Sequence, residues 1–283
     1  ETAGLAEKVD LLISVFTGNF LLTEDLLPVL FWARDHHLKP GGRMIPNRAQ
    51  MWVAPVSAKE FYEQNIQAWS EAVHGLSFEK ARSLVCNSLF YSNKKQFKAK
   101  LLADPVCIHD IDLMAATDAS CDAEVELTFT SGGHCHGWLG WMDISLDDDW
   151  LSTGPDAPDT HWSRVLLPLE EPLEVEAGQR VQLSLSRPEY GEWAWKTRHL
   201  GKQQNQSTFL SAPLGPADLL KRSQAYRPSA SEMGKAARFV LSVMQGDLST
   251  SEIVQQLCAD YPKLFISSPS ARRFVEELII KYT

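Results

Sequence analysis

The feature that most constrains this chain is a short apolar run followed by a glycine-containing loop and a second apolar segment. Residues 9–14 are apolar around one acid, as in a strand buried on both faces of a sheet, and the pattern predicts strand, loop and helix in that order. In open α/β sheets, ligands bind where loops leave the carboxyl ends of strands. Residues 14–24 are therefore a candidate rim of an active site, with an ordinary buried strand and crossover helix as the alternative.

Local signals place the ends of this helix. Thr23 or Asn19 can cap a helix that starts near Glu24, and Pro28 falls in its first turn, where a missing N–H does little harm. The Lys-Pro-Gly-Gly sequence at residues 39–42 stops it.

A helical insertion follows a strand-like segment at residues 44–56. It covers residues 57–92 and opens with a capping-box pattern from Ser57 to Glu60. Its apolar side chains recur near helical spacing: Phe61, Ile66, Trp69, Val73 and Phe78. This aromatic side needs a surface to cover it, which is either its own domain or a second chain.

Residues 104–200 have the alternation and the Gly-, Pro- and Asp-rich turns of an all-β region, which predicts a β-barrel or sandwich. His134 and His136 share one face of an expected strand, with Cys135 between them. No further pair of ligands accompanies them, so we expect no metal site.

The remainder divides into a polar linker and a helical domain. Residues 201–213 are mostly polar, and the linker is expected to extend over 201–229. Helices are predicted after the capping box at Ser249 and after Ser268-Pro-Ser. Residues 241–257 are similar to small winged-helix modules of the PqqD-like, peptide-binding kind, and an ordinary helical appendage is the alternative.

Composition limits the classes of function. At 283 residues the chain is long enough for two domains, and its net charge of −9 argues against nucleic-acid binding. Five cysteines without a Cys-x-x-Cys pair indicate reduced thiols in a cytoplasmic or nuclear protein. There is no signal segment and no apolar stretch of membrane-spanning length, so we expect no membrane partner. The missing initial Met, and a first strand with nothing before it to pair with, suggest a fragment of a longer protein.

Two motifs resemble the protein arginine N-methyltransferase family. In that family a strand ends in Ser-Glu-x-x-Gly-x-x-Leu-x-x-Glu, the double-E loop, and the next helix finishes at Leu-Lys-Pro-Gly-Gly. The matching residues are Ser14, Val15, Gly18, Leu21, Glu24 and residues 38–42. Leu-Ser-Thr-Gly-Pro at residues 151–155, followed by Thr160, His161 and Trp162, looks like the family's Thr-His-Trp loop. The resemblance covers residues 5–197.

The resemblance implies a fold that combines an α/β domain with a β domain. Residues 1–42 would be the C-terminal remnant of a Rossmann-type methyltransferase domain, and residues 43–200 a β-barrel with a helical dimerisation arm at about 57–92. Residues 230–283 lie outside the usual core of the family, and we expect them to form a small helical or winged-helix-like domain. In that family the arm packs on the cofactor domain of a second subunit, so a homo- or heterodimer is implied.

The resemblance also implies methyl transfer from S-adenosylmethionine to an arginine of a protein substrate. The guanidinium must be held for an in-line displacement, and two carboxylates do this in the family. Glu24 matches the second carboxylate, whereas Val15 replaces the first; losing such a contact costs about 1.5–3 kcal/mol. The other implied site residues are His161 with a catalytic role, Thr160, Trp162 and Gly18 in the substrate pocket, and Ser14 and Thr17 beside the cofactor.

The cofactor needs a glycine-rich turn after the first strand of the fold and an acid after the second. The only adjacent glycine pairs, at residues 41–42 and 132–133, are not suitably placed. We therefore expect that this chain alone neither holds S-adenosylmethionine nor acts as an enzyme. It is either part of an arginine methyltransferase completed by a missing N-terminal half, or a catalytically inactive subunit, a prozyme or scaffold, that binds an active partner.

Overall fold

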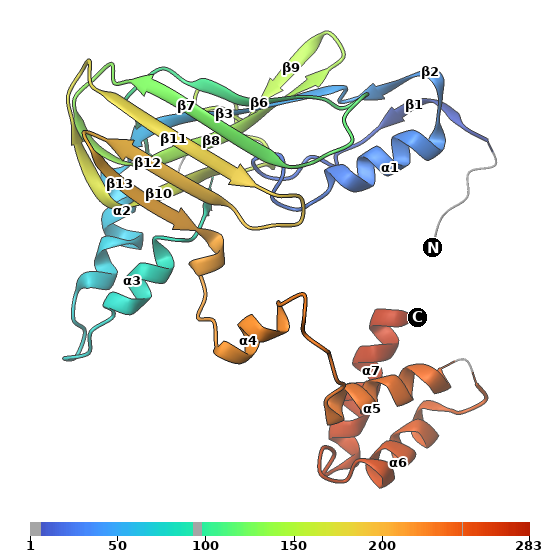
Figure 1. Cartoon of the computed structure of the whole chain (residues 1–283). Coiled ribbons are helices and arrows are strands. Elements are labelled where there is room, and N and C mark those ends of the chain that lie inside the picture. The colour runs from blue at the N-terminus through green and yellow to red at the C-terminus, as the bar shows by residue number, and fades with distance from the viewer. Residues whose placement is uncertain (1–6, 93–97, 245) are drawn as a thin grey trace. The chain divides into compact units, whose positions relative to one another are not determined.

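The computed structural model describes residues 7–92, 98–244 and 246–283, in two compact units. The first unit, Glu1–Pro213, contains the strands, and the second, Leu214–Thr283, is helical (Figure 1). No described helix is both long and apolar enough to cross a membrane.

The first unit opens with a strand, a helix and a parallel strand: β1 (Val9–Ile13), α1 (Leu27–His37) and β2 (Leu38–Ile45). Helix α1 has Pro28 in its first turn and ends just before the Lys-Pro-Gly-Gly sequence, as predicted. Its predicted start is wrong by about three residues. The N-cap is Leu26 without a side-chain bond, because the preceding residues form a tight loop instead of a helical turn.

The expectation that the first strand is buried on both faces is wrong for the described chain. Leu11 is 44% exposed and Ile13 71% exposed. Strand β1 pairs only with β2 among the described residues, so its other edge has no strand beside it. The apolar composition of β1 resembles that of an interior strand of a parallel sheet, but its side chains are only partly covered.

Two larger sheets form the body of this unit (Figure 1). A four-stranded sheet has the order β13 (Lys202–Ser207), β12 (Ala194–His199), β11 (Arg180–Arg187), β7 (Cys121–Thr128). A seven-stranded sheet has the order β4 (Phe90–Ser92), β10 (Arg164–Val175), β8 (Gly133–Leu146), β3 (Arg48–Ser57), β5 (Lys100–Leu101), with β6 (Val106–Asp112) on β3 and β9 (Asp149–Ser152) on β8.

The two sheets enclose one hydrophobic core. Alternate residues of β11 point inward, as the period of a strand requires, and Val181, Leu183 and Leu185 are buried. Two indole N–H groups bridge the sheets: Trp138 donates to Thr197 Oγ1 at 2.9 Å, and Trp195 donates to the Pro168 carbonyl at 2.9 Å. The predicted β region is therefore confirmed as two sheets packed around a common core.

The predicted linker is wrong over its first part, because residues 202–207 form β13. This strand pairs along its length with β12 through a tight turn in which Leu200 and Gly201 have φ of 47° and 77°. Its composition is polar since it lies at the edge of the sheet, where Gln206 is its one buried side chain. The first unit ends at Pro213, and η2 (Thr208–Leu210) and α4 (Pro216–Lys221) lie within the rest of the predicted linker.

The helical insertion contains α2 (Lys59–Asn65), η1 (Gln67–Ser70) and α3 (Glu79–Val85). The predicted capping box is wrong, because Ser57 is still part of β3 and the N-cap is Ala58. Tyr62 fixes the base of the insertion by donating to the carbonyls of Leu169 and Glu170 at 3.1 and 2.7 Å. Residues 93–97 of this region lie outside the described chain.

The second unit contains α5 (Glu232–Val243), α6 (Thr250–Asp260) and α7 (Ser268–Tyr282) around a separate apolar core. The capping box at Ser249 is confirmed, since its hydroxyl accepts from Glu252 N and the Glu252 carboxylate accepts from Ser249 N. Helix α7 has Ser267 at its N-cap, without a side-chain bond. No strand occurs among the described residues of this unit, which fits the helical alternative and not a winged helix.

Candidate functional site

The loop between β1 and α1, residues 14–25, is called the carboxylate loop here because it carries Glu24. Gly18 and Leu21 exchange backbone hydrogen bonds of 3.1 and 2.9 Å, which folds the loop back on itself. Phe20, Leu21 and Asp25 have φ of 46°, 61° and 52°, a region that costs non-glycine residues about 1–2 kcal/mol each. The side chains of Phe20 and Leu21 are completely buried in the core, which holds the loop in this conformation.

The Glu24 side chain folds over Gly18. A Cβ on Gly18 would lie only 1.8 Å from Glu24 Oε2, so glycine is required for this placement of the carboxylate. The other oxygen, Oε1, accepts a hydrogen bond of 2.5 Å from Asn19 Nδ2. Glu24 is exposed, and its carboxylate therefore faces solvent from a defined position.

The Thr-His-Trp segment, residues 160–162, contacts the carboxylate loop directly. Trp162 Nε1 donates to the Thr17 carbonyl at 2.6 Å, and Ser163 N donates to Asn19 Oδ1 at 2.6 Å. The segment is a compact turn, because Thr160 Oγ1 accepts from Trp162 N at 3.1 Å. The His161 ring is exposed and lies 3.8 Å from that of Trp162. Two stretches separated by more than 130 residues thus form one surface.

Val15 belongs to the carboxylate loop and is 65% exposed, at the position where the resemblance places the first carboxylate. An apolar side chain accepts no hydrogen bond, so Glu24 is the only one of the two family carboxylates that the loop offers.

Ser14 and Thr17, the two residues that the resemblance places beside a cofactor, lie at the start of the carboxylate loop. Thr17 is almost fully buried, and its hydroxyl has no hydrogen-bond partner. Ser14 uses its hydroxyl to accept from Phe16 N at 3.0 Å and its own N–H to pair with Ile45 O. Among the described residues, neither glycine pair precedes a helix N-terminus, where a phosphate or carboxylate would bind.

A third group of contacts, not predicted from the sequence, anchors the end of the carboxylate loop. Arg187 Nη2 donates to both carboxylate oxygens of Asp25 at 2.8 Å, and Tyr190 N donates to Asp25 Oδ1 at 3.1 Å. The Arg187 guanidinium lies over the Trp193 ring, which stacks on Phe20 at 5.1 Å. No local sequence signal reveals the contacts of Asp25 with Arg187 and Tyr190, because these residues are 162 and 165 positions from Asp25.

The expected histidine face has a structural role. His136 is buried and accepts a hydrogen bond of 3.2 Å from Ala58 N, at the start of the helical insertion. Cys135 points into the core. Within the described residues, no group of three or more His, Cys, Asp or Glu is arranged to hold a metal ion.

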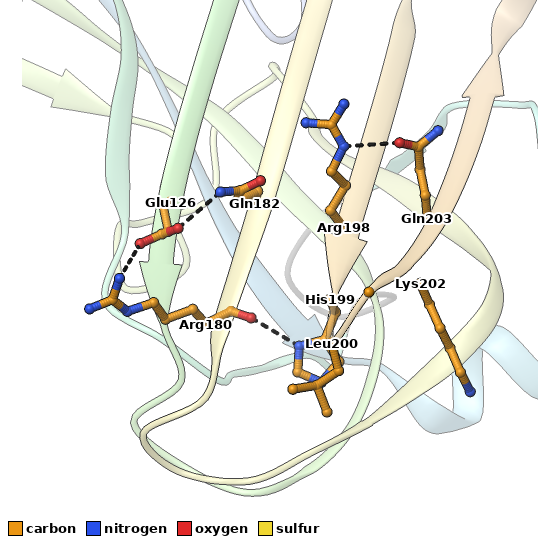
Figure 2. A pocket seen from close by; sticks show the side chains of 9 residues that line it. Glu126, Arg180, Gln182, Arg198, His199, Leu200, Lys202 and Gln203 are labelled. Atoms are coloured by element: carbon orange, nitrogen blue, oxygen red, sulfur yellow. Dashed lines mark hydrogen bonds and ion pairs between the residues drawn. The ribbon is translucent and has the colours of Figure 1, made fainter.

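A polar hollow of about 450 Å³ lies at the end of the four-stranded sheet (Figure 2). Figure 2 shows Glu126 between Arg180 and Gln182, each donating to it at 3.0 Å, and Arg198 donating to Gln203 at 2.9 Å. These are exposed cross-strand pairs of a sheet surface. The hollow contains no residue of either motif, so the carboxylate loop remains the candidate site.

Comparison with known proteins identifies the family of the chain. The family described as the arginine methyltransferase oligomerization subdomain matches residues 47–194, just over half of the chain. Protein arginine N-methyltransferase 1 of Schizosaccharomyces pombe is 27% identical over 180 residues, covering 62% of this chain and 53% of the relative. Protein arginine N-methyltransferase 6 of Xenopus tropicalis is 30% identical over 193 residues, covering 64% and 56%. The chain spans about half the length of the curated relatives it matches.

Solved structures share the fold. The Trypanosoma brucei PRMT1 enzyme-prozyme heterotetrameric complex with AdoHcy gives a TM-score of 0.64 at 22% identity, covering 73% of this chain and 70% of that one. Arabidopsis thaliana protein arginine methyltransferase 10, in an open conformation, gives 0.60 at 20% identity, covering 73% and 72%.

Proposed function

Because this chain belongs to the protein arginine methyltransferase family, we propose that it supplies the acceptor side of an arginine-methylating site. The methyl group would come from S-adenosylmethionine held by a cofactor-binding half of the family fold. The observation that carries this proposal is the pair of 2.6 Å contacts that join the Thr-His-Trp segment to the carboxylate loop. They create one surface from the two motifs of the family.

Glu24 would take one edge of the guanidinium through charge-assisted hydrogen bonds, which orient the planar group and draw its charge away from the attacking nitrogen. Its carboxylate is exposed and already ordered by Asn19 and Gly18. Trp162, packed on the loop, and the exposed His161 would form the barrel side of the same pocket. Preorganisation of this kind lowers the cost of placing the acceptor for an in-line displacement.

A second candidate function follows from Val15. With one carboxylate absent, a complete site would orient the guanidinium less well, and the rate of methyl transfer would be lower by about 10- to 100-fold. The chain would then serve as a catalytically inactive subunit that supports an active partner.

The helical insertion supports the proposed dimer in either case. An apolar hollow of about 550 Å³ lies on it, and its lining includes Trp69, Val73 and Phe78. Strand β4, which ends the insertion, is linked to the site because Tyr91 OH lies 2.9 Å from Thr23 Oγ1 of the carboxylate loop. The lining of the hollow includes Phe90 of β4, so a subunit docked there would adjoin the strand that contacts the carboxylate loop.

The test is to fuse residues 1–283 behind the cofactor-binding half of the S. pombe relative and to measure methyl transfer to an arginine- and glycine-rich peptide. We expect transfer that is lost in Glu24→Gln and raised at least about tenfold in Val15→Glu, which restores a charge-assisted contact. A folded, dimeric fusion that is inactive with the native Val15 and becomes active in the Val15→Glu variant would favour the inactive-subunit function. Inactivity of both would contradict the acceptor role of Glu24.

A further inference from the structure

The side-chain amide of Asn19 lies between the two motifs and bonds to both. Its Oδ1 accepts from Ser163 N at 2.6 Å, and its Nδ2 donates to Glu24 Oε1 at 2.5 Å. Ser163 directly follows the Thr-His-Trp segment and precedes β10. One side chain therefore connects the backbone of the barrel to the carboxylate of the proposed site.

We propose that Asn19 is a positioning residue for Glu24, so that the orientation of a bound guanidinium depends on the position of the Thr-His-Trp segment. This inference rests on the proposed function, because it names what sets the geometry of the same site. It also gives Asn19 a role different from the helix cap that the sequence suggested.

The chemistry of the two bonds selects an amide. The Ser163 N–H requires an acceptor, and the Glu24 carboxylate requires a donor, so one short side chain must present both. Aspartate supplies the acceptor but would place a second negative charge against Glu24. Serine and threonine hydroxyls can both donate and accept, but they are shorter by one atom and cannot span two partners on opposite sides of a planar group.

The position of Glu24 needs such a support. A glutamate at the surface loses about 1.5–2 kcal/mol of rotamer freedom when it is held in one conformation. Gly18 removes the steric obstacle beneath the carboxylate but provides no attraction for it. Asn19 is the one side chain that donates to the Glu24 carboxylate in the described chain. Val15 occupies the position where the family has its other carboxylate, so the loop offers Glu24 alone to orient the guanidinium.

The bond uses one lone pair of Oε1 and leaves the remaining lone pairs of the carboxylate for a substrate. A displacement of the Thr-His-Trp segment would move Ser163, then the Asn19 amide, and then Glu24. A substrate that orders this segment would in this way also order the carboxylate that binds its guanidinium.

The experiment compares Asn19→Ala and Asn19→Asp with the matched surface variants Asn205→Ala and Asn205→Asp, since Asn205 lies exposed on β13. Tryptophan fluorescence and near-UV circular dichroism of the 283-residue chain check that each variant is folded. Amide hydrogen exchange at Ser163 then reports the first bond. The separation of the two Glu24 γ-proton resonances reports whether the carboxylate is held in one rotamer.

In Asn19→Ala we expect Ser163 to exchange at least about tenfold faster and the Glu24 resonances to converge. In Asn19→Asp, Ser163 should stay protected while the Glu24 resonances still converge, because the acceptor is kept and the donor is lost. In the active fusion described above, both variants should lower kcat by about 10- to 100-fold with a smaller change in KM. The Asn205 variants should change none of these quantities.

Unchanged Glu24 resonances in Asn19→Ala would overturn the inference, whatever the activity of the fusion. Full kcat in Asn19→Asp, with the Glu24 resonances converged, would also overturn it. Catalysis would then need only the hydrogen bond from Ser163 N to residue 19 and not an ordered Glu24 carboxylate. An inactive wild-type fusion with normal Glu24 ordering would instead contradict the proposed function, so the two failures are distinguishable.

Discussion

Replacing Asp25 with alanine should destabilise the first unit by about 3 kcal/mol, because it leaves the Arg187 guanidinium buried without its counter-charge. The Arg187 side chain is 4% exposed and that of Asp25 is 25% exposed, so the pair is poorly screened by solvent. Two bonds of 2.8 Å join them, and Arg187 Nη1 already has no hydrogen-bond partner. Breaking a buried pair typically costs about 3–5 kcal/mol; partial exposure of Asp25 places the estimate at the lower end.

The assay is urea unfolding followed by tryptophan fluorescence. All nine tryptophans lie in the first unit, so the signal reports that unit alone. A loss of about 3 kcal/mol is about a hundredfold in the folding equilibrium constant and should lower the midpoint urea concentration at constant slope. The control is Glu126→Ala, which removes the exposed partner of Arg180 and should cost less than about 1 kcal/mol.

The double variant Asp25→Ala/Arg187→Leu separates the cost of the unpaired charge from the cost of the lost side-chain packing. It removes the unpaired charge, and we expect it to recover more than half of the lost stability. A loss below about 1 kcal/mol in Asp25→Ala, or no recovery in the double variant, would refute the argument that the buried charge dominates.

Three further predictions concern other contacts. Gly18→Ala should displace the Glu24 carboxylate, because the new Cβ would lie 1.8 Å from Oε2. The exposed Glu24 side chain can turn into solvent, so we expect a cost below about 1 kcal/mol in urea unfolding. The Glu24 γ-proton resonances should converge, and unchanged resonances would contradict the steric reasoning. Burial, with a smaller contribution from the neighbouring His134, lowers the pKa of His136 below its ordinary value of 6.5. As the pH falls, the unfolded chain therefore binds a proton at His136 before the folded chain does. The contribution of neutral His136 to stability is complete above pH 6.5 and is lost as the pH falls from 6.5 toward the folded pKa. The protection of the Ala58 amide against exchange, relative to its intrinsic rate at each pH, should decrease over this range in the wild type because Ala58 N donates to His136, and His136→Gln should remove this decrease. Ellman's reagent should label at most two thiols of the native chain, Cys107 and Cys258, because Cys86, Cys121 and Cys135 are buried from the reagent. Burial also raises the pKa of these three thiols, to about 11 for Cys86 and about 12 for Cys121 and Cys135. Rapid labelling of a third thiol would show that the core opens.

Local patterns in the sequence were sufficient where the structure is determined locally. The end of α1, the alternation of the β region and the capping box at Ser249 are each encoded within a few residues, and all three are present. The polar strand β13 was missed because its order comes from pairing with β12 and not from its own composition. Ser57 fits a capping pattern but remains in β3, because strand pairing competes for the same residue.

The residues of the site also fall into two groups, those that a local motif indicates and those that depend on contacts between distant parts of the chain. That Gly18, Glu24 and Trp162 lie on one surface could be predicted, because family motifs contain these residue types, and their roles toward a substrate stay predictions. The contacts of Asn19 with Ser163 and of Asp25 with Arg187 could not, since each joins positions more than 140 residues apart and has no periodic or spacing signal. Their partners become evident only once the barrel has brought the two loops together.

The left-handed backbone at Phe20 and Leu21 changes where mutational sensitivity of the site should be sought. Both side chains are completely buried and neither can touch a substrate, yet they hold the turn that presents Glu24. Glycine would relieve the backbone strain but would empty the core beneath the loop, and a β-branched residue would fill the core but resist the left-handed region. A scan restricted to polar surface groups would therefore overlook two hydrophobic positions where few replacements are acceptable.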